Sequence, residues 1–106
     1  MEVSAWKNRK LGSGSASFAL SMSNKDRNDY INREWKTVIL HLDGHPNPVE
    51  ANIDKFSFWK TCPHFISTEI KAWLTKNKYI PWEKGKPPKF FMSQIQDSNH
   101  FIVQKK

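Results

Sequence analysis

The sequence is poor in cysteine, in long apolar runs and in acidic residues. Cys62 is the only cysteine among 106 residues, so an internal disulfide is excluded. No apolar run approaches the roughly 18–20 residues that a membrane-spanning helix needs. The first residues also lack the basic-then-apolar pattern of a signal peptide. These absences exclude disulfide scaffolds and proteins with membrane helices, and they predict an intracellular protein, in the cytoplasm or, in a eukaryote, the nucleus.

The shortage of acidic residues leaves a strongly basic chain. There are 17 Lys and Arg against 10 Asp and Glu, which gives a formal charge of +7. A small basic protein attracts polyanions, and the commonest polyanion inside cells is nucleic acid. Solvated surface lysines would give the same composition without any such partner. The length fits one domain over residues 1–106, and the 13% of aromatic residues can fill its core.

The hydrophobic pattern predicts short strands and two helices. Phe18, Leu20 and Met22 alternate with small residues, which indicates a strand over 17–23. Before it, residues 1–16 combine a basic cluster with Gly12 and Gly14 and are expected to form a partly flexible basic arm. A helix is expected over 25–33 after a cap at Ser23, and another over 68–76 between a cap at Ser67 and a left-handed stop at Asn77. Strands are expected over 36–42, 49–53, 90–95 and 100–104, and an aromatic loop over 56–64.

The connections between these elements set the fold class. They are too short to cross over and lay helices on both faces of a parallel sheet. We therefore expect a mainly β protein, an open antiparallel pseudobarrel with two short helices. Such a β-barrel arrangement also protects the edge strands.

Three kinds of catalytic or metal site can be tested against the residue spacing. A zinc site could use His41, His45, Cys62 and His64, but only His41 and His45 have the spacing of a close ligand pair. A metal-dependent nuclease could use Asp54 with Glu69 and Lys71, but the last two fall on a predicted helix instead of a strand. Cys62 with His64 could act as nucleophile and base, but Pro63 disturbs their alignment. The sequence thus predicts no catalytic residue, no metal and no cofactor, and the protein is not expected to be an enzyme.

Basic, amide and hydroxyl side chains gather in three segments, the arm 7–15, the turn 25–28 and the loop 60–67. These groups can donate hydrogen bonds to phosphate oxygens and to the edges of bases. Most of the aromatic residues Trp6, Trp35, Phe56, Phe58 and Trp59 are expected in the core, with Trp59 the candidate for partial exposure. The candidate DNA-binding residues are Lys7, Asn8, Arg9, Lys10, Ser13, Ser15, Lys25, Arg27, Asn28, Trp59, Lys60, Thr61, His64 and Ser67.

The order of these segments resembles a known family. A basic arm, a strand opening onto Asp26-Arg27, a short helix, the strand 37–42, a Phe-x-Phe-Trp segment and a Lys-Gly-Lys-Pro-Pro turn before two strands are similar to the DNA-binding pseudobarrel domain of the B-three type. That domain occurs in plant transcription factors and as the recognition or effector domain of some bacterial restriction endonucleases. The glycine-tryptophan signature of the plant domains is absent from this sequence.

The resemblance implies a function and two binding segments. The family domain is not catalytic and grips the major groove of double-stranded DNA with two arms. Transferred to this sequence, the arms are residues 7–17, with Arg9 and Lys10, and residues 57–67, with Trp59, Lys60, Thr61 and His64. The resemblance also leaves room for a protein partner or an attached domain such as a nuclease, as in some homologues.

The predicted function is therefore a non-enzymatic double-stranded DNA-binding module, with sequence-specific recognition left open. One alternative is single-stranded nucleic-acid binding on exposed aromatic residues. Another is a protein-interaction module of a phage or plasmid, with Trp59, Phe65 and Pro63 as an apolar anchor.

Overall fold

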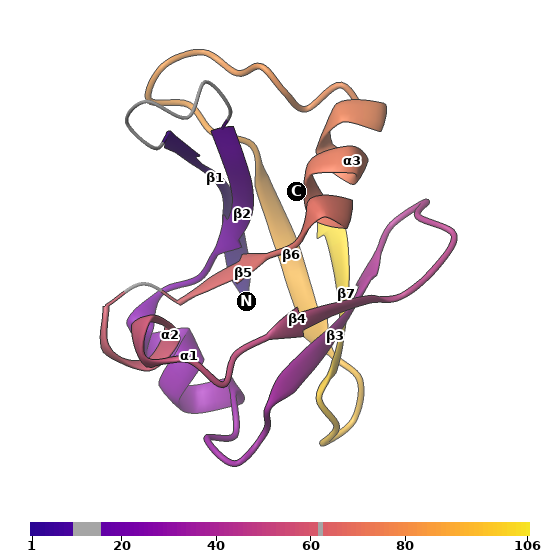
Figure 1. The fold of residues 1–106 in the computed structure, drawn as a ribbon. Coiled ribbons are helices and arrows are strands. Elements are labelled where there is room, and N and C mark those ends of the chain that lie inside the picture. Colours follow the sequence, from indigo (N-terminus) through magenta and orange to yellow (C-terminus); the bar gives the residue numbers. More distant parts are fainter. Residues whose placement is uncertain (10–15, 62) are drawn as a thin grey trace.

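A computed structural model describes residues 1–9, 16–61 and 63–106 (Figure 1). These residues form seven strands and three short helices. Their order is β1 (Glu2–Arg9), β2 (Ala16–Ser21), α1 (Asn24–Tyr30), β3 (Thr37–Leu42), β4 (Val49–Asn52), α2 (Phe56–Lys60), β5 (His64–Ile66), α3 (Thr68–Lys76), β6 (Lys89–Gln94) and β7 (His100–Lys105).

All seven strands belong to one sheet with the order β4-β3-β7-β6-β1-β2-β5. Its edge strands β4 and β5 come close to each other, so the sheet nearly closes into a barrel. This arrangement confirms the mainly β pseudobarrel that the sequence predicts. Two details differ: β3 and β7 are parallel, which makes the sheet mixed instead of antiparallel, and the described residues form three helices instead of two. Five elements, β4, α2, β5, α3 and β6, lie between β3 and β7 in the sequence, and this length of chain allows a parallel pair.

The core follows from the alternation of side chains along the strands. Val38, Leu40 and Leu42 point inward from β3, and Phe101 and Val103 meet them from β7. The helices lie at opposite ends of the barrel, α3 at one end and α1 with α2 at the other (Figure 1). α3 covers its end with Ile70, Trp73 and Leu74, and α2 covers the other end with Phe58.

The N-terminal segment is the main correction to the predicted fold. Residues 2–9 form β1, which pairs with β2 and β6, where the sequence analysis expects a flexible arm. Val3 and Ala5 are buried and alternate with Ser4 and Trp6, which is the pattern of a strand. The partner β6 lies some eighty residues further along the chain, so local composition gave no sign of the pairing.

The helices at α1 and α2 also differ from the expected boundaries. α1 begins as expected at the Ser23 cap, whose hydroxyl accepts from the Asp26 amide at 3.1 Å, but it ends at Tyr30. Residues 56–60 form α2 where a loop was expected. Phe58 is fully buried and packs on Phe65, with ring centroids 5.6 Å apart. This tertiary contact stabilises a helix of five residues, which local propensity alone does not support.

α3 occupies the predicted residues and begins at the predicted cap. The hydroxyl of Ser67 accepts a hydrogen bond from the Glu69 amide at 3.2 Å. The indole N–H of Trp73 donates to the carbonyl of Asp43 at 2.8 Å and joins the helix to the end of β3. Asn77 is not left-handed, as the sequence suggested; the positive φ, 60°, belongs to Lys78.

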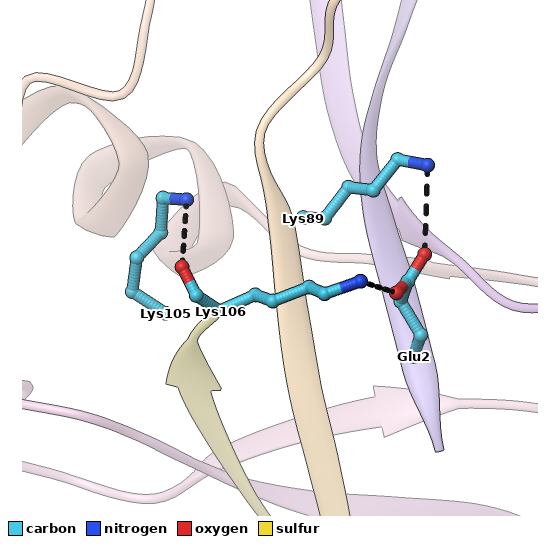
Figure 2. Close-up of polar contacts among 4 residues, drawn as sticks. All are labelled: Glu2, Lys89, Lys105 and Lys106. Carbon is cyan, nitrogen blue, oxygen red and sulfur yellow. Dashed lines mark hydrogen bonds and ion pairs between the residues drawn. The ribbon is translucent and has the colours of Figure 1, made fainter.

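The chain ends are joined by ion pairs around Glu2 (Figure 2). Its carboxylate lies 3.5 Å from the ammonium of Lys89 and also accepts a hydrogen bond from Lys106. The hydrogen bond from Lys106 is the main cause that lowers the pKa of Glu2 below its ordinary value. These contacts join the starts of β1 and β6 to the end of β7.

Within the described ranges, no helix is both long and apolar enough to cross a membrane.

Candidate nucleic-acid interface

Cationic side chains gather around Trp59 where α1 meets α2. The indole of Trp59 is half-buried against the core. The guanidinium carbons of Arg27 and Arg33 lie 5.8 and 5.0 Å from its ring centroid. Guanidinium groups at this distance are attracted by the aromatic ring face. We call Arg27, Arg33, Lys55, Trp59 and Lys60 the α1–α2 surface.

Arg27 holds this surface together from inside. Only 8% of the residue is exposed, and its Nη1 donates to the carbonyl of Phe58 at 3.0 Å. Its Nε donates to Oδ1 of Asn28 at 3.2 Å. The guanidinium is therefore committed to contacts between α1 and α2, and Arg27 positions the surface more than it offers donors to a ligand. Arg33, by contrast, is exposed.

A depression of about 300 Å³ opens beside Trp59 and is lined by Arg33, Asp54, Lys55, Phe56, Trp59 and Lys60. The acidic residue in this lining, Asp54, is 3.4 Å from the ammonium of Lys36 and is partly neutralised by it. Burial lowers the pKa of Lys55 below its ordinary value. Because the lining holds Arg33, Lys55 and Lys60 with Asp54 as its acidic residue, the depression is positive on balance, and Phe56 and Trp59 give it an aromatic wall.

Phe56 is the residue of this surface that departs most from expectation. The sequence analysis places it with the core aromatics, but 75% of Phe56 is exposed. Successive helical residues are about 100° apart, so Phe56 and Phe58 point to nearly opposite sides of α2. Because Phe58 turns toward the core, Phe56 faces solvent.

The outer face of β1, β2 and β5 runs from this surface toward the other end of the barrel. In the register, Trp6, Ala19 and Ile66 form one row, and Ser21 faces His64 in another. The His64 ring packs on Trp6 with centroids 4.1 Å apart, and only 8% of His64 is exposed. Burial, and secondarily the charge of Lys55, lowers the pKa of His64. His64 therefore acts in packing and favours its neutral form.

The first predicted arm starts at the far end of the same strands. Lys7 is exposed in β1 opposite Phe18, while Asn8 pairs with Ser17 and Arg9 with Ala16. β2 runs about 17 Å from Ala16 to Ser21 at 3.3–3.4 Å per residue. At its Ser21 end it pairs with β5. The described parts of the two predicted arms therefore lie at opposite ends of β2 (Figure 1). Lys10, Ser13 and Ser15 lie outside the described residues.

The remaining candidate donors already have partners within the chain. Lys25 pairs with Asp29 at 2.7 Å. The Thr61 hydroxyl donates to the Ser57 carbonyl at 3.2 Å, and Ser67 caps α3. These side chains stabilise helix ends and are not gathered with Trp59.

The residues of the hypothetical metal sites are not brought together either. His41 Nε2 and His100 Nδ1 lie 2.9 Å apart, whereas His45 faces Glu69 at 3.8 Å and His64 packs on Trp6. Cys62 lies outside the described residues. Across residues 1–9, 16–61 and 63–106, no three His, Cys, Asp or Glu side chains are placed to hold one metal ion.

Sequence reasoning missed Arg33, Lys55 and Phe56. None of the three was among the candidate DNA-binding residues. Arg33 was only the last residue of a predicted helix, and Phe56 was expected in the core. A basic residue next to each of two aromatic segments, Lys55-Phe56 and Arg33 near Trp35, is the signal that could have drawn attention to them. The contact between these segments depends on the pairing of β3 with β4 and could not be read locally.

The protein-interaction alternative loses its proposed anchor. Phe65 is fully buried and Pro63 is also buried, so they cannot form an exposed apolar anchor with Trp59.

Comparisons of the chain with protein-family models, with curated proteins and with solved structures gave no match.

Proposed function

We propose that this protein is a non-enzymatic module that binds double-stranded DNA. The observation that carries the proposal is the α1–α2 surface, where Arg33, Lys55 and Lys60 surround an aromatic depression whose acidic residue, Asp54, is paired with Lys36. Arginine and lysine donors in such a cluster suit phosphate oxygens, and an arginine that stacks on an indole is held in a fixed orientation. Intracellular DNA is the polyanion that fits a basic chain of this kind.

The separation of the two ends of β2 supports a grip on a groove. The β1–β2 end carries Lys7, which pairs with Phe18, and the α1–α2 surface lies beyond the other end of β2, at Ser21. The three residue steps from Phe18 to Ser21 span about 10 Å along the strand. The major groove of B-form DNA is about 12 Å wide, so contacts at both ends could reach the phosphates on its two sides. The face between them, with Trp6 and Ile66, would lie over the groove.

The decisive measurement is anisotropy of a labelled duplex titrated with the protein over a series of salt concentrations. Binding should weaken steeply with salt, because each phosphate contact releases counterions. Lys60→Ala, Arg33→Ala and Arg9→Ala should each weaken binding and lower the slope of log affinity against log salt by about one. Lys105→Ala, which removes an exposed charge from β7, is the matched control and should change binding little.

The proposal fails if duplex does not bind at low salt or if binding is insensitive to salt. It also fails for the α1–α2 surface if Lys105→Ala weakens binding as much as Lys60→Ala. The melting temperature of each variant separates a lost contact from a lost fold.

A single observation favours single-stranded nucleic acid as a second candidate. The ring of Phe56 is exposed beside Lys55 and Lys60, and stacking of a base on an aromatic side chain is worth about 1–3 kcal/mol. This candidate expects single strands to bind more tightly than duplex and Phe56→Ala to weaken that binding at least several-fold. A duplex partner expects the opposite preference, so the two probes in parallel decide between them.

A further inference from the structure

A second cavity lies at the end of the barrel that α3 covers, away from the α1–α2 surface. It has a volume of about 380 Å³ and is lined by Lys7, Phe18, Thr75, Ile80, Pro81 and Trp82. β1 and β2 supply Lys7 and Phe18, which face each other across the strands, and α3 supplies Thr75. The remaining wall is the segment that follows α3. We call this cavity the apolar cleft.

The walls of the apolar cleft suit an aromatic ligand. Phe18 and Trp82 meet edge to face, with centroids 5.8 Å apart and planes at 79°. This arrangement forms a corner in which another ring can stack on one aromatic face and meet the edge of the other. Phe18, Ile80 and Trp82 are partly buried and pack on the core, so the corner is supported from behind. Its volume lies within the range of about 300–1,000 Å³ found for small-molecule sites, which are mostly apolar with few polar groups.

The polar groups of the apolar cleft have one sign of charge. Lys7 lines it, and the ammonium of Lys71 lies 5.9 Å from the Phe18 ring centroid. No acidic residue lines it, and among the ion pairs of the described ranges neither lysine has an acidic partner. The Thr75 hydroxyl donates to the Lys71 carbonyl at 2.8 Å, which leaves lone pairs but no free donor. A ligand that satisfies this site has an apolar body and a negative group near Lys7.

We propose that the apolar cleft binds a small aromatic carboxylate. The rings of Phe18 and Trp82 hold its apolar part, and the ammonium of Lys7, assisted by Lys71, faces its carboxylate. The proposal concerns a site apart from the α1–α2 surface and does not rest on DNA binding. Lys7 is common to this site and to the first DNA arm, so an occupied cleft would compete with the duplex for that charge.

The test measures dissociation constants by amide-shift titration with two probes of the same shape, naphthoate and the neutral naphthylmethanol. Naphthoate should bind saturably and move the amides of Phe18, Thr75 and Trp82. Lys7→Met keeps the apolar stem and removes the charge, so it should weaken naphthoate about three- to fivefold, as expected for a partly exposed ion pair. The same variant should leave naphthylmethanol unchanged. Lys105→Met is the matched control and should affect neither probe.

The proposal is overturned if naphthoate shows no saturable binding, or if the shifts map away from the apolar cleft. It is also overturned if Lys7→Met weakens both probes equally or neither. Because neither probe involves DNA, a failed duplex titration leaves this result unaffected.

Discussion

The α1–α2 surface and the apolar cleft stand at opposite ends of β2 and use the same kinds of residue in different ways. The cations over the Trp59 ring are arginines, and the buried one is fixed by hydrogen bonds to Phe58 and Asn28, while Lys55 and Lys60 line the depression beside the ring. In the apolar cleft the cations are lysines at the rim, and the aromatic rings of Phe18 and Trp82 pack on each other. Arginine is planar and can stack and donate at once, while lysine is a mobile point charge.

The difference teaches that aromatic and basic content does not define the chemistry of a surface. At the α1–α2 surface Phe56 turns outward, and charge dominates the depression beside it. At the apolar cleft the rings of Phe18 and Trp82 form the walls, and charge is confined to the rim. The first arrangement suits an extended polyanion, and the second suits a compact molecule with one negative group. Four comparisons of stability, in order of decreasing effect, test which residues are buried and which are exposed in these parts of the molecule.

The largest effect should come from removing the ring that anchors α2. Phe58→Ala should lower the free energy of unfolding by about 3–5 kcal/mol, because the ring is fully buried against Phe65. Phe56→Ala, two residues earlier on the same helix, should change stability by less than about 0.5 kcal/mol. Denaturant unfolding of both variants measures the difference. Equal effects would mean that Phe56 is not the solvent-facing residue of α2.

The next largest effect is a difference in stability between variants of the two arginines at Trp59. Arg27→Met should lower the free energy of unfolding by about 1.5–3 kcal/mol, because it removes buried charge-assisted hydrogen bonds. Arg33→Met should leave stability nearly unchanged, since Arg33 is exposed. In duplex binding, Arg33→Met should weaken the affinity directly, because Arg33 is the exposed arginine of the two. Thermal melts combined with the duplex titration test this, and a strongly destabilised Arg33→Met would contradict the assigned roles.

Acidification should lower the free energy of unfolding by a smaller amount. The residue concerned is His64, on the outer face of β1, β2 and β5 between the two regions. Burial lowers the pKa of His64 in the folded protein below its ordinary value of 6.5, which the unfolded chain keeps. The unfolded chain therefore takes up a proton first, and stability should fall as the pH drops through this ordinary value. His64→Phe keeps a ring against Trp6 and should flatten the dependence between about pH 7 and pH 5. Unfolding curves of both proteins at several pH values provide the comparison, and an unchanged slope would assign the dependence to other histidines.

The smallest effect is expected at Glu2, where the charges are exposed. The hydrogen bond from Lys106 lowers the folded pKa of Glu2 below its ordinary value of 4.5. The stabilisation is present above this ordinary value and should be lost as the pH falls through the lowered folded pKa. Glu2→Gln should remove this acid sensitivity, and added salt should reduce it in the unaltered protein. Melting temperatures at low and high salt test both points. A salt-independent effect would mean that the pair is more shielded than the exposed fractions of its side chains, 48% for Lys106 and 38% for Glu2, indicate.

The sequence predicted those elements whose pattern is local. Ser67 with the spacing of Ile70, Trp73 and Leu74 defined α3 to the residue, since a cap and one apolar face suffice for a helix. The alternation of Val38, Leu40 and Leu42 defined β3 in the same way. In the candidate site, the sequence selected Arg27, Trp59 and Lys60, because basic side chains lie beside aromatic residues there.

The rest required contacts between distant residues. β1 is a strand because β2 and β6 pair with it, and α2 is a helix because Phe58 packs on Phe65. Arg33 belongs to the site because the turn after α1 brings it over Trp59. Such contacts depend on which segments meet, and a pattern along a single stretch of chain does not contain that information.

By itself, the sequence determined a basic chain rich in aromatic residues, built of short strands that have to close on a common core. Only the tertiary structure decided which aromatic rings enter that core and which face solvent, and where the positive charges meet. The physical reason is that burial of a side chain depends on the elements packed against it. The pairing of strands far apart in the sequence places those elements.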